Sequence, residues 1–154
     1  MSIVVEKIAE IPNLMVGEGP HRDVRTQALY FVDIIGKSVH KYVPATGQHT
    51  KATFDKAASL VIPVKGQRDK FVVNQLDEIV VAFWDGHSEK LSKIEKSVDI
   101  NQPDTSLNDG KCDAMGRLWT GIFFCGRKIT SVGWGGAGLD VLYVTSASVL
   151  SRGV

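Results

Sequence analysis

The sequence has few cysteines, no long apolar run and almost no net charge. Only two of its 154 residues are cysteines, Cys112 and Cys125, too few for a disulfide framework or a paired-cysteine metal site. The 18 lysines and arginines nearly balance the 17 aspartates and glutamates, so there is no electrostatic reason to expect nucleic acid or an anionic membrane as a partner. No apolar run approaches the roughly 20 residues that a membrane span needs.

The beginning of the chain also lacks the apolar stretch of a secretory signal peptide. Glu6 and Lys7 place charges where that stretch would lie. We therefore expect a cytoplasmic protein with reduced thiols and no membrane contact. The four histidines show no spacing typical of metal ligands, and a chain of this length can bury a core without a metal or disulfides.

What the sequence does contain is a series of short apolar segments rich in β-branched and aromatic residues. Glycine, aspartate, asparagine or proline bounds each one, which is typical of strands rather than helices. Helical spacing occurs at Leu91, Ile94 and Val98, but residues 97–100 alternate as a strand does. The sequence therefore predicts an all-β fold with strands at residues 28–34, 70–74, 78–84, 117–123 and 140–145, and turns at 44–47 and 84–87.

A repeat runs through these segments. A polar residue near glycine, a turn and a strand with leucine beside an aromatic residue recur from Glu18, Asn108 and Thr130, with a weaker copy at Ser59. The first two intervals between these starts are about 40 and about 50 residues, the length of a four-stranded propeller blade, whereas the last is about 20. One unit has therefore been cut short, unless the match is a coincidence among glycine-rich hairpins.

The same pattern predicts which side chains are buried. Cys112 is expected to be a small core residue, and Trp84, Trp119 and Trp134 to pack between blades. The residues expected to be largely buried in strands are Leu29, Phe31, Val72, Val80, Leu118, Trp119, Leu142 and Val144.

Three segments, in family order, resemble the regucalcin, gluconolactonase and luciferin-regenerating enzyme family, also known as the senescence marker protein family. Residues 108–121 (NDGKCDAMGRLWTG) resemble its signature, residues 17–20 and 29–34 its first blade, and residues 128–147 a segment of its last part. Members of this family are similar six-bladed β-propellers. The resemblance therefore implies an incomplete six-bladed propeller of about three blades, as a single partial domain over residues 1–154.

The last of these segments lies too early for a complete member of the family. Six blades of about 45 residues need about 270 residues, and the chain has 154. We infer that residues 1–124 match the first blades, residues 126–147 a late blade and residues 148–154 a divergent tail. The middle blades are then missing at a join near Cys125, Gly126 and Arg127, as in an alternatively spliced or truncated product.

The resemblance also implies a site. The family holds a divalent metal (Ca²⁺, Zn²⁺, Mg²⁺ or Mn²⁺) on the propeller axis, and Glu18 matches its first-blade ligand. Asn108 matches a substrate-contacting asparagine, whose carboxamide can both donate to and accept from sugar hydroxyls; an Asx turn leading into Asp109 is the alternative role. Ser106 stands where the family usually has a substrate-contacting arginine, and a hydroxyl cannot supply that cationic fork.

The expected function is metal-dependent hydrolysis of a small-molecule sugar lactone such as gluconolactone, impaired in this chain. No residue here matches the family's catalytic aspartate or its metal-binding asparagine, so the catalytic residues stay unassigned. The alternatives are a non-catalytic calcium-binding regulatory protein and an inactive splice product. Loss of the middle blades would leave apolar blade faces and strand edges without neighbours, which predicts self-association.

Overall fold

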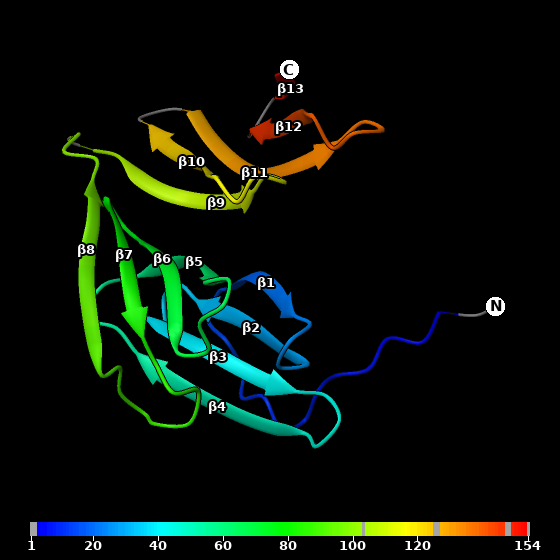
Figure 1. Cartoon of the computed structure of the whole chain (residues 1–154), viewed down its shortest axis with the longest axis vertical. Helices are drawn as coiled ribbons and strands as arrows, with labels where there is room; N and C mark the ends of the chain where they lie inside the picture. Colours follow the sequence, from blue (N-terminus) through cyan, green and yellow to red (C-terminus); the bar gives the residue numbers. More distant parts are fainter. Residues whose placement is uncertain (1–2, 103, 125–126, 147–148, 154) are drawn as a thin grey trace.

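The computed structural model describes residues 3–102, 104–124, 127–146 and 149–153, and strands are their only regular elements (Figure 1). They form three antiparallel sheets, two with four strands and one with five. The all-β prediction is confirmed. Within these residues there is no helix that could cross a membrane.

The strands follow one another along each sheet in chain order, so each sheet is a meander. The first sheet contains β1 (Gly17–Asp23), β2 (Ala28–Asp33), β3 (Ser38–Val43) and β4 (Gln48–Thr53). The second contains β5 (Ala58–Pro63), β6 (Lys70–Gln75), β7 (Glu78–Phe83) and β8 (Lys93–Asp99). The third contains β9 (Ser106–Cys112), β10 (Leu118–Phe124), β11 (Arg127–Gly135), β12 (Val141–Ser146) and β13 (Val149–Gly153).

The segments predicted as strands are confirmed as β2, β6, β7, β10 and β12. Residues 44–47 lie in the turn between β3 and β4, and residues 84–87 in the connection between β7 and β8. The ambiguous segment that contains Ile94 and Val98 is strand β8, so its alternation, and not its helical spacing, decides its structure.

The three sheets lie around a common centre, open on the side toward which the N-terminal segment projects (Figure 1). The first strand of each sheet, β1, β5 or β9, faces this centre, and β5 contacts both of the others. The strands β4 and β8 lie at the periphery. Residues from three distant parts of the chain therefore meet along the inner strands.

The main apolar core lies between the first and second sheets. Its members include Tyr30 and Val32 on β2, and Val73 on β6, together with Trp84 just after β7. Trp84 is 1% exposed, and its ring lies 6.5 Å from that of Tyr30 and 6.1 Å from that of Phe71, within the usual range for aromatic pairs. The prediction that Trp84 packs between neighbouring sheets is confirmed.

The burial predictions hold less well in the third sheet. Phe31 and Val80 are buried as expected, and Leu29, Val72, Leu118, Leu142 and Val144 are half-buried. Trp119 is 42% exposed and Cys112 is exposed, so both were wrongly assigned to the core. Trp119 contacts Trp134 within its own sheet, at 5.7 Å between ring centroids, and not across two sheets. Trp119 is exposed because the third sheet packs on the second through β9, and β10 lies one strand further out. Cys112 is exposed because it is the last residue of β9 and lies beyond the buried Gly110.

Replacing Trp84 with alanine should destabilise the fold far more than the same change at Trp119. Removing a fully buried tryptophan leaves a cavity and costs about 3–5 kcal/mol. Trp119→Ala loses a partly exposed ring, its contacts with Trp134 and Arg117 and an exposed hydrogen bond to Asp113, about 1–2 kcal/mol in total. Urea denaturation followed by far-ultraviolet circular dichroism measures both. Equal losses in the two variants would contradict the assignment of the core to the first two sheets.

Candidate functional site

Glu18 lies near the start of the inner strand β1, at a place where the backbone comes unusually close to β5. Gly19 has a φ of +60°, and a Cβ atom at this position would lie 3.4 Å from the carbonyl oxygen of Ser59. The register of β1 against β2 shifts between Glu18 and His21, which marks an irregularity in the strand. The Gly-Glu-Gly sequence thus bends β1 against β5 and leaves the Glu18 carboxylate half-buried.

The second predicted residue, Asn108, lies within the inner strand β9, where the register against β10 shifts between Leu107 and Gly110. The Asx turn at this position stays a prediction. The neighbouring Gly110 is buried, and a Cβ atom there would lie 2.7 Å from the Trp119 carbonyl oxygen and 3.0 Å from Leu60 Cδ2. The glycine of the Asn-Asp-Gly signature is therefore needed for β9 to pack between β10 and β5. The Asn108 carboxamide donates to the Thr130 carbonyl oxygen at 3.5 Å.

Two buried polar side chains of the second sheet donate hydrogen bonds to the backbone of Asn108. Ser59 Oγ donates to the carbonyl oxygens of Leu107 at 3.0 Å and Asn108 at 3.1 Å. Asn74 Nδ2 donates to the Asn108 carbonyl oxygen at 2.9 Å and to Thr120 Oγ1 at 2.7 Å. These contacts tie the second sheet to both β9 and β10, and they fix the backbone from which the Asn108 side chain extends.

Asp109 is a residue of the candidate site that the sequence did not single out, although it belongs to the signature. Its carboxylate accepts hydrogen bonds from Ser131 Oγ at 2.6 Å, from the Val132 amide at 3.4 Å and from the Gly110 amide at 2.8 Å. It therefore holds β11 against β9. The Asn-Asp-Gly sequence was the available signal, but the partner Ser131 depends on how β11 crosses the third sheet.

Glu18 and Asp109 interact electrostatically across the inner strands. The pKa of Glu18 is raised above its usual 4.5, first by burial and then by the negative charge of Asp109. The Asp109 carboxylate on the third sheet thus disfavours ionisation of the Glu18 carboxylate on the first sheet. Such a pair is suited to attract a hard cation, or to hold a proton that a reaction could use.

The oxygen chemistry of this pair fits a divalent metal, but the number of ligands is small. Among the residues that the structure describes, no three histidine, cysteine, aspartate or glutamate side chains are arranged to hold a metal ion. Calcium usually takes six to eight oxygen ligands, so Glu18 and Asp109 would need amide, carbonyl or water oxygens beside them. The buried Asn74 Oδ1 accepts no hydrogen bond within the described part of the chain.

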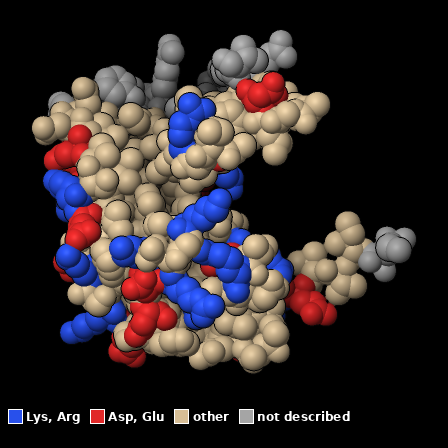
Figure 2. All heavy atoms as spheres, in the orientation of Figure 1, with Lys and Arg blue, Asp and Glu red and all other residues tan. Residues whose placement is uncertain are grey.

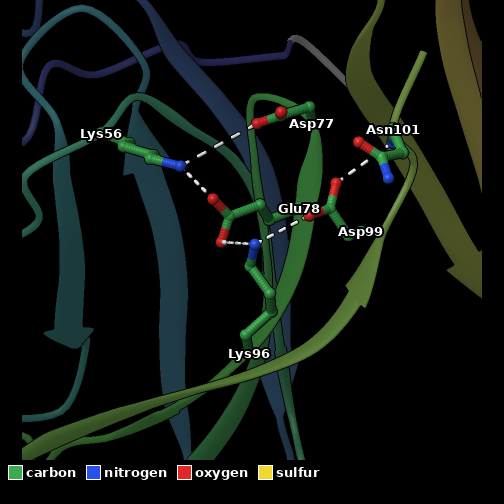
Figure 3. Close-up of polar contacts among 6 residues, drawn as sticks. All are labelled: Lys56, Asp77, Glu78, Lys96, Asp99 and Asn101. Carbon is green, nitrogen blue, oxygen red and sulfur yellow. Dashed lines mark hydrogen bonds and ion pairs between the residues drawn. The ribbon is translucent and has the colours of Figure 1, made fainter.

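A second group of charged residues lies at the end of the second sheet, and its members are already paired (Figure 3). Glu78 contacts Lys56 through one carboxylate oxygen and Lys96 through the other, the latter at 3.7 Å. Lys96 also reaches Asp99 at 2.8 Å, and Lys56 lies 4.0 Å from Asp77. Because each carboxylate has a lysine partner, these acids stabilise the strand ends and are not candidates for the site at Glu18.

Glu18→Gln should raise the melting temperature at neutral pH and have little effect at acid pH. Folding raises the pKa of Glu18. The carboxyl group therefore does not lower the free energy of unfolding below its ordinary pKa of 4.5, but it does so as the pH rises through the folded-state pKa. Thermal melts of the variant and the parent from pH 3.5 to 8 test this. Glu6→Gln, in the exposed N-terminal segment, is the control; a neutral-pH loss of stability in Glu18→Gln would contradict the prediction.

Comparison with known proteins agrees with the motifs. The SMP-30/Gluconolactonase/LRE-like region family matches residues 16–128. YvrE of Bacillus subtilis strain 168, whose assigned name is that of a sugar lactone lactonase, is 30% identical over 70% of this chain and 35% of its own length. Regucalcin of Danio rerio is 30% identical over 82% of this chain and 41% of its own length. The chain thus spans less than half the length of these relatives.

Solved structures show the same relationship. A luciferin-regenerating enzyme matches 97% of this chain and 48% of its own, with a TM-score of 0.77 and 40% sequence identity. A regucalcin from Agrobacterium tumefaciens, described as a calcium-binding protein, matches 94% of this chain and 44% of its own, with a TM-score of 0.62 and 19% identity, which shows the fold alone. Together with the family match over residues 16–128, these likenesses establish that the chain belongs to the SMP-30/gluconolactonase/luciferin-regenerating enzyme family.

Proposed function

We propose that the three sheets are about three blades of an incomplete six-bladed β-propeller. The inner strands β1, β5 and β9 around one centre support this arrangement, as does the meander order of each sheet. The five strands of the third sheet support a join of two part-blades, β9 and β10 from an early blade and β11 to β13 from a late one. Of the residues at the proposed join, Cys125 and Gly126 lie outside the described residues.

The chain carries, in this proposal, part of a metal-dependent sugar lactonase site. The observation that carries the proposal is the placement of Glu18 on β1 and of Asn108 and Asp109 on β9, two inner strands that face one centre, with the charge of Asp109 acting on the half-buried Glu18. Glu18 would be the metal ligand, with Ca²⁺, Zn²⁺, Mg²⁺ or Mn²⁺ as the cation. When bound, the metal would polarise the lactone carbonyl group.

The residues of this chain would bind and orient the substrate. The Asn108 carboxamide would hydrogen-bond to a sugar hydroxyl, in exchange for its long contact with Thr130. Ser59 and Asn74 would keep the Asn108 backbone in place, because both donate to its carbonyl oxygen. Ser106 brings no positive charge to the substrate, and the assignment of the general base stays open, which supports an impaired activity.

The exposed free thiol of Cys112 supports a reducing compartment such as the cytoplasm. The non-catalytic alternative, a calcium-binding regulatory protein, has the support of the regucalcin relatives, one of which is described as calcium-binding. It differs from the enzyme in one respect: it requires a cation at Glu18 but no turnover of a lactone.

Self-association is part of the same proposal. Several large apolar side chains are exposed on the outer strand β8 and on the third sheet, namely Ile94, Val98, Trp119, Ile122 and Tyr143. Contact between two copies would remove this surface from water, at about 25 cal/mol for each Å² of apolar area. In such an assembly, the second copy would supply the metal ligands that the site at Glu18 lacks.

The isolated monomer should hydrolyse gluconolactone negligibly with Ca²⁺, Zn²⁺ or Mn²⁺. Size-exclusion chromatography with light scattering separates monomer from assembled chain, and each fraction is assayed with the parent, Glu18→Ala and the control Glu6→Ala. Turnover by the monomer well above the uncatalysed rate, lost in Glu18→Ala, would contradict the proposed impairment. Turnover in any fraction that Glu18→Ala leaves unchanged would contradict the placement of the site at Glu18.

A further inference from the structure

The third sheet carries a cavity that has no part in the site at Glu18. It has a volume of about 490 Å³, within the usual range for small-molecule sites, and lies between the β9–β10 turn and the β11–β12 turn. On the face that Figure 2 shows, lysine, arginine, aspartate and glutamate are fewer among the described residues of the third sheet than on the other two sheets. The cavity is lined mainly by Met115, Trp119, Trp134, Leu139 and Leu142, and three charged residues, Asp113, Arg117 and Asp140, also line it.

One wall of the cavity is a closed hydrogen-bonded unit. The Asp113 carboxylate accepts from Arg117 Nε at 2.6 Å and from Trp119 Nε1 at 3.1 Å, and it also accepts from the backbone amides of Met115 and Arg117. The Arg117 guanidinium lies 5.9 Å from the centre of the Trp119 ring. The charges of Asp113 and Arg117 therefore cancel. The hydrogen bond to Asp113 fixes the orientation of Trp119, and the contact with Arg117 is a cation–π interaction on the same ring.

The opposite wall presents an unpaired carboxylate. Asp140 is exposed and makes no hydrogen bond or ion pair with any described residue. A tight turn sets its place: the Leu139 amide donates to the Gly136 carbonyl oxygen at 3.2 Å, and a Cβ atom on Gly136 would lie 2.7 Å from Asp140 Oδ1. Leu139 itself has a φ of 53°, a strained value for a leucine, and its side chain is 56% exposed.

We propose that this cavity binds a small organic cation with an apolar body, such as a quaternary ammonium or a protonated amine. Asp140 leaves the lining with one net negative charge, which favours a cation and disfavours an anion. Trp119 and Trp134 meet edge to face at 82°, so their rings offer two differently oriented aromatic surfaces. Aromatic surfaces beside a carboxylate are the arrangement that recognises ammonium groups.

The probes are choline and its neutral isostere, in which carbon replaces the ammonium nitrogen. Both are titrated against the full chain and followed by tryptophan fluorescence. We expect saturable binding of choline and about five- to tenfold weaker binding of the isostere, since the cation–π and ion-pair contributions are lost. Asp140→Asn should weaken choline binding by about two- to fivefold, whereas the control Asp55→Asn, at another exposed position, should leave it unchanged.

Trp119→Leu provides an independent variant and should abolish the preference for choline over the isostere; thermal melts establish that each variant is folded. Equal affinities of the two probes in the parent would show that the cavity takes apolar ligands without regard to charge, and would overturn the proposal. Absence of saturable choline binding would do the same, as would occupation of the cavity by a second copy, seen as probe affinity that falls with protein concentration.

Discussion

Hydrogen bonds from two buried side chains, Ser59 and Asn74, hold the second and third sheets together. Both donate to the carbonyl oxygen of Asn108, and Asn74 also reaches the hydroxyl of Thr120. Asn74 is completely buried, so loss of these contacts would leave polar groups unpaired in the interior, at a cost of about 1–3 kcal/mol each. The close approach of β9 to β5, which requires glycine at position 110, depends on these bonds, and the position of Asn108 depends on that approach.

The core and the site at Glu18 have opposite effects on the stability of the fold. The core between the first two sheets is apolar and closely packed, with Trp84 against Tyr30 and Phe71. At the inner strands, by contrast, Glu18 is kept half-buried near Asp109, where burial and a like charge both disfavour its ionised form. A carboxylate retained under such conditions is typical of a functional group, because the fold would be more stable without it.

Much of the fold follows from the sequence, because β-branched and aromatic segments bounded by glycine and aspartate are strong local signals. The segments around Phe71 and Val80 are strands for this reason. Exposure that depends on the packing of neighbouring sheets was not predictable. Cys112 and Trp119 resemble core residues but are exposed, since Cys112 ends the inner strand β9 and Trp119 lies on β10, one strand further from the second sheet. Whether a side chain is covered depends on the next sheet, and the local sequence does not contain that information.

The residues of the candidate site were likewise only partly predictable from the sequence. Glu18 and Asn108 were predicted from motifs, and both lie on inner strands. Ser59 and Asn74 were not, because a polar residue in a strand has many roles and only the packing of β9 reveals theirs. The structural role of Asp109 was not predicted because its partner Ser131 lies on β11, beyond the segment that carries the signature.

The central claim is that the inner strands bring Glu18 and Asp109 together although they are far apart in the sequence. The most direct test is the pKa of the Glu18 carboxyl group, measured by carbon-detected magnetic resonance titration in the parent and in Asp109→Asn. The account predicts a value above 4.5 in the parent and a lower value in Asp109→Asn, because a nearby negative charge has been removed. A Glu18 pKa that is the same in both proteins would contradict it.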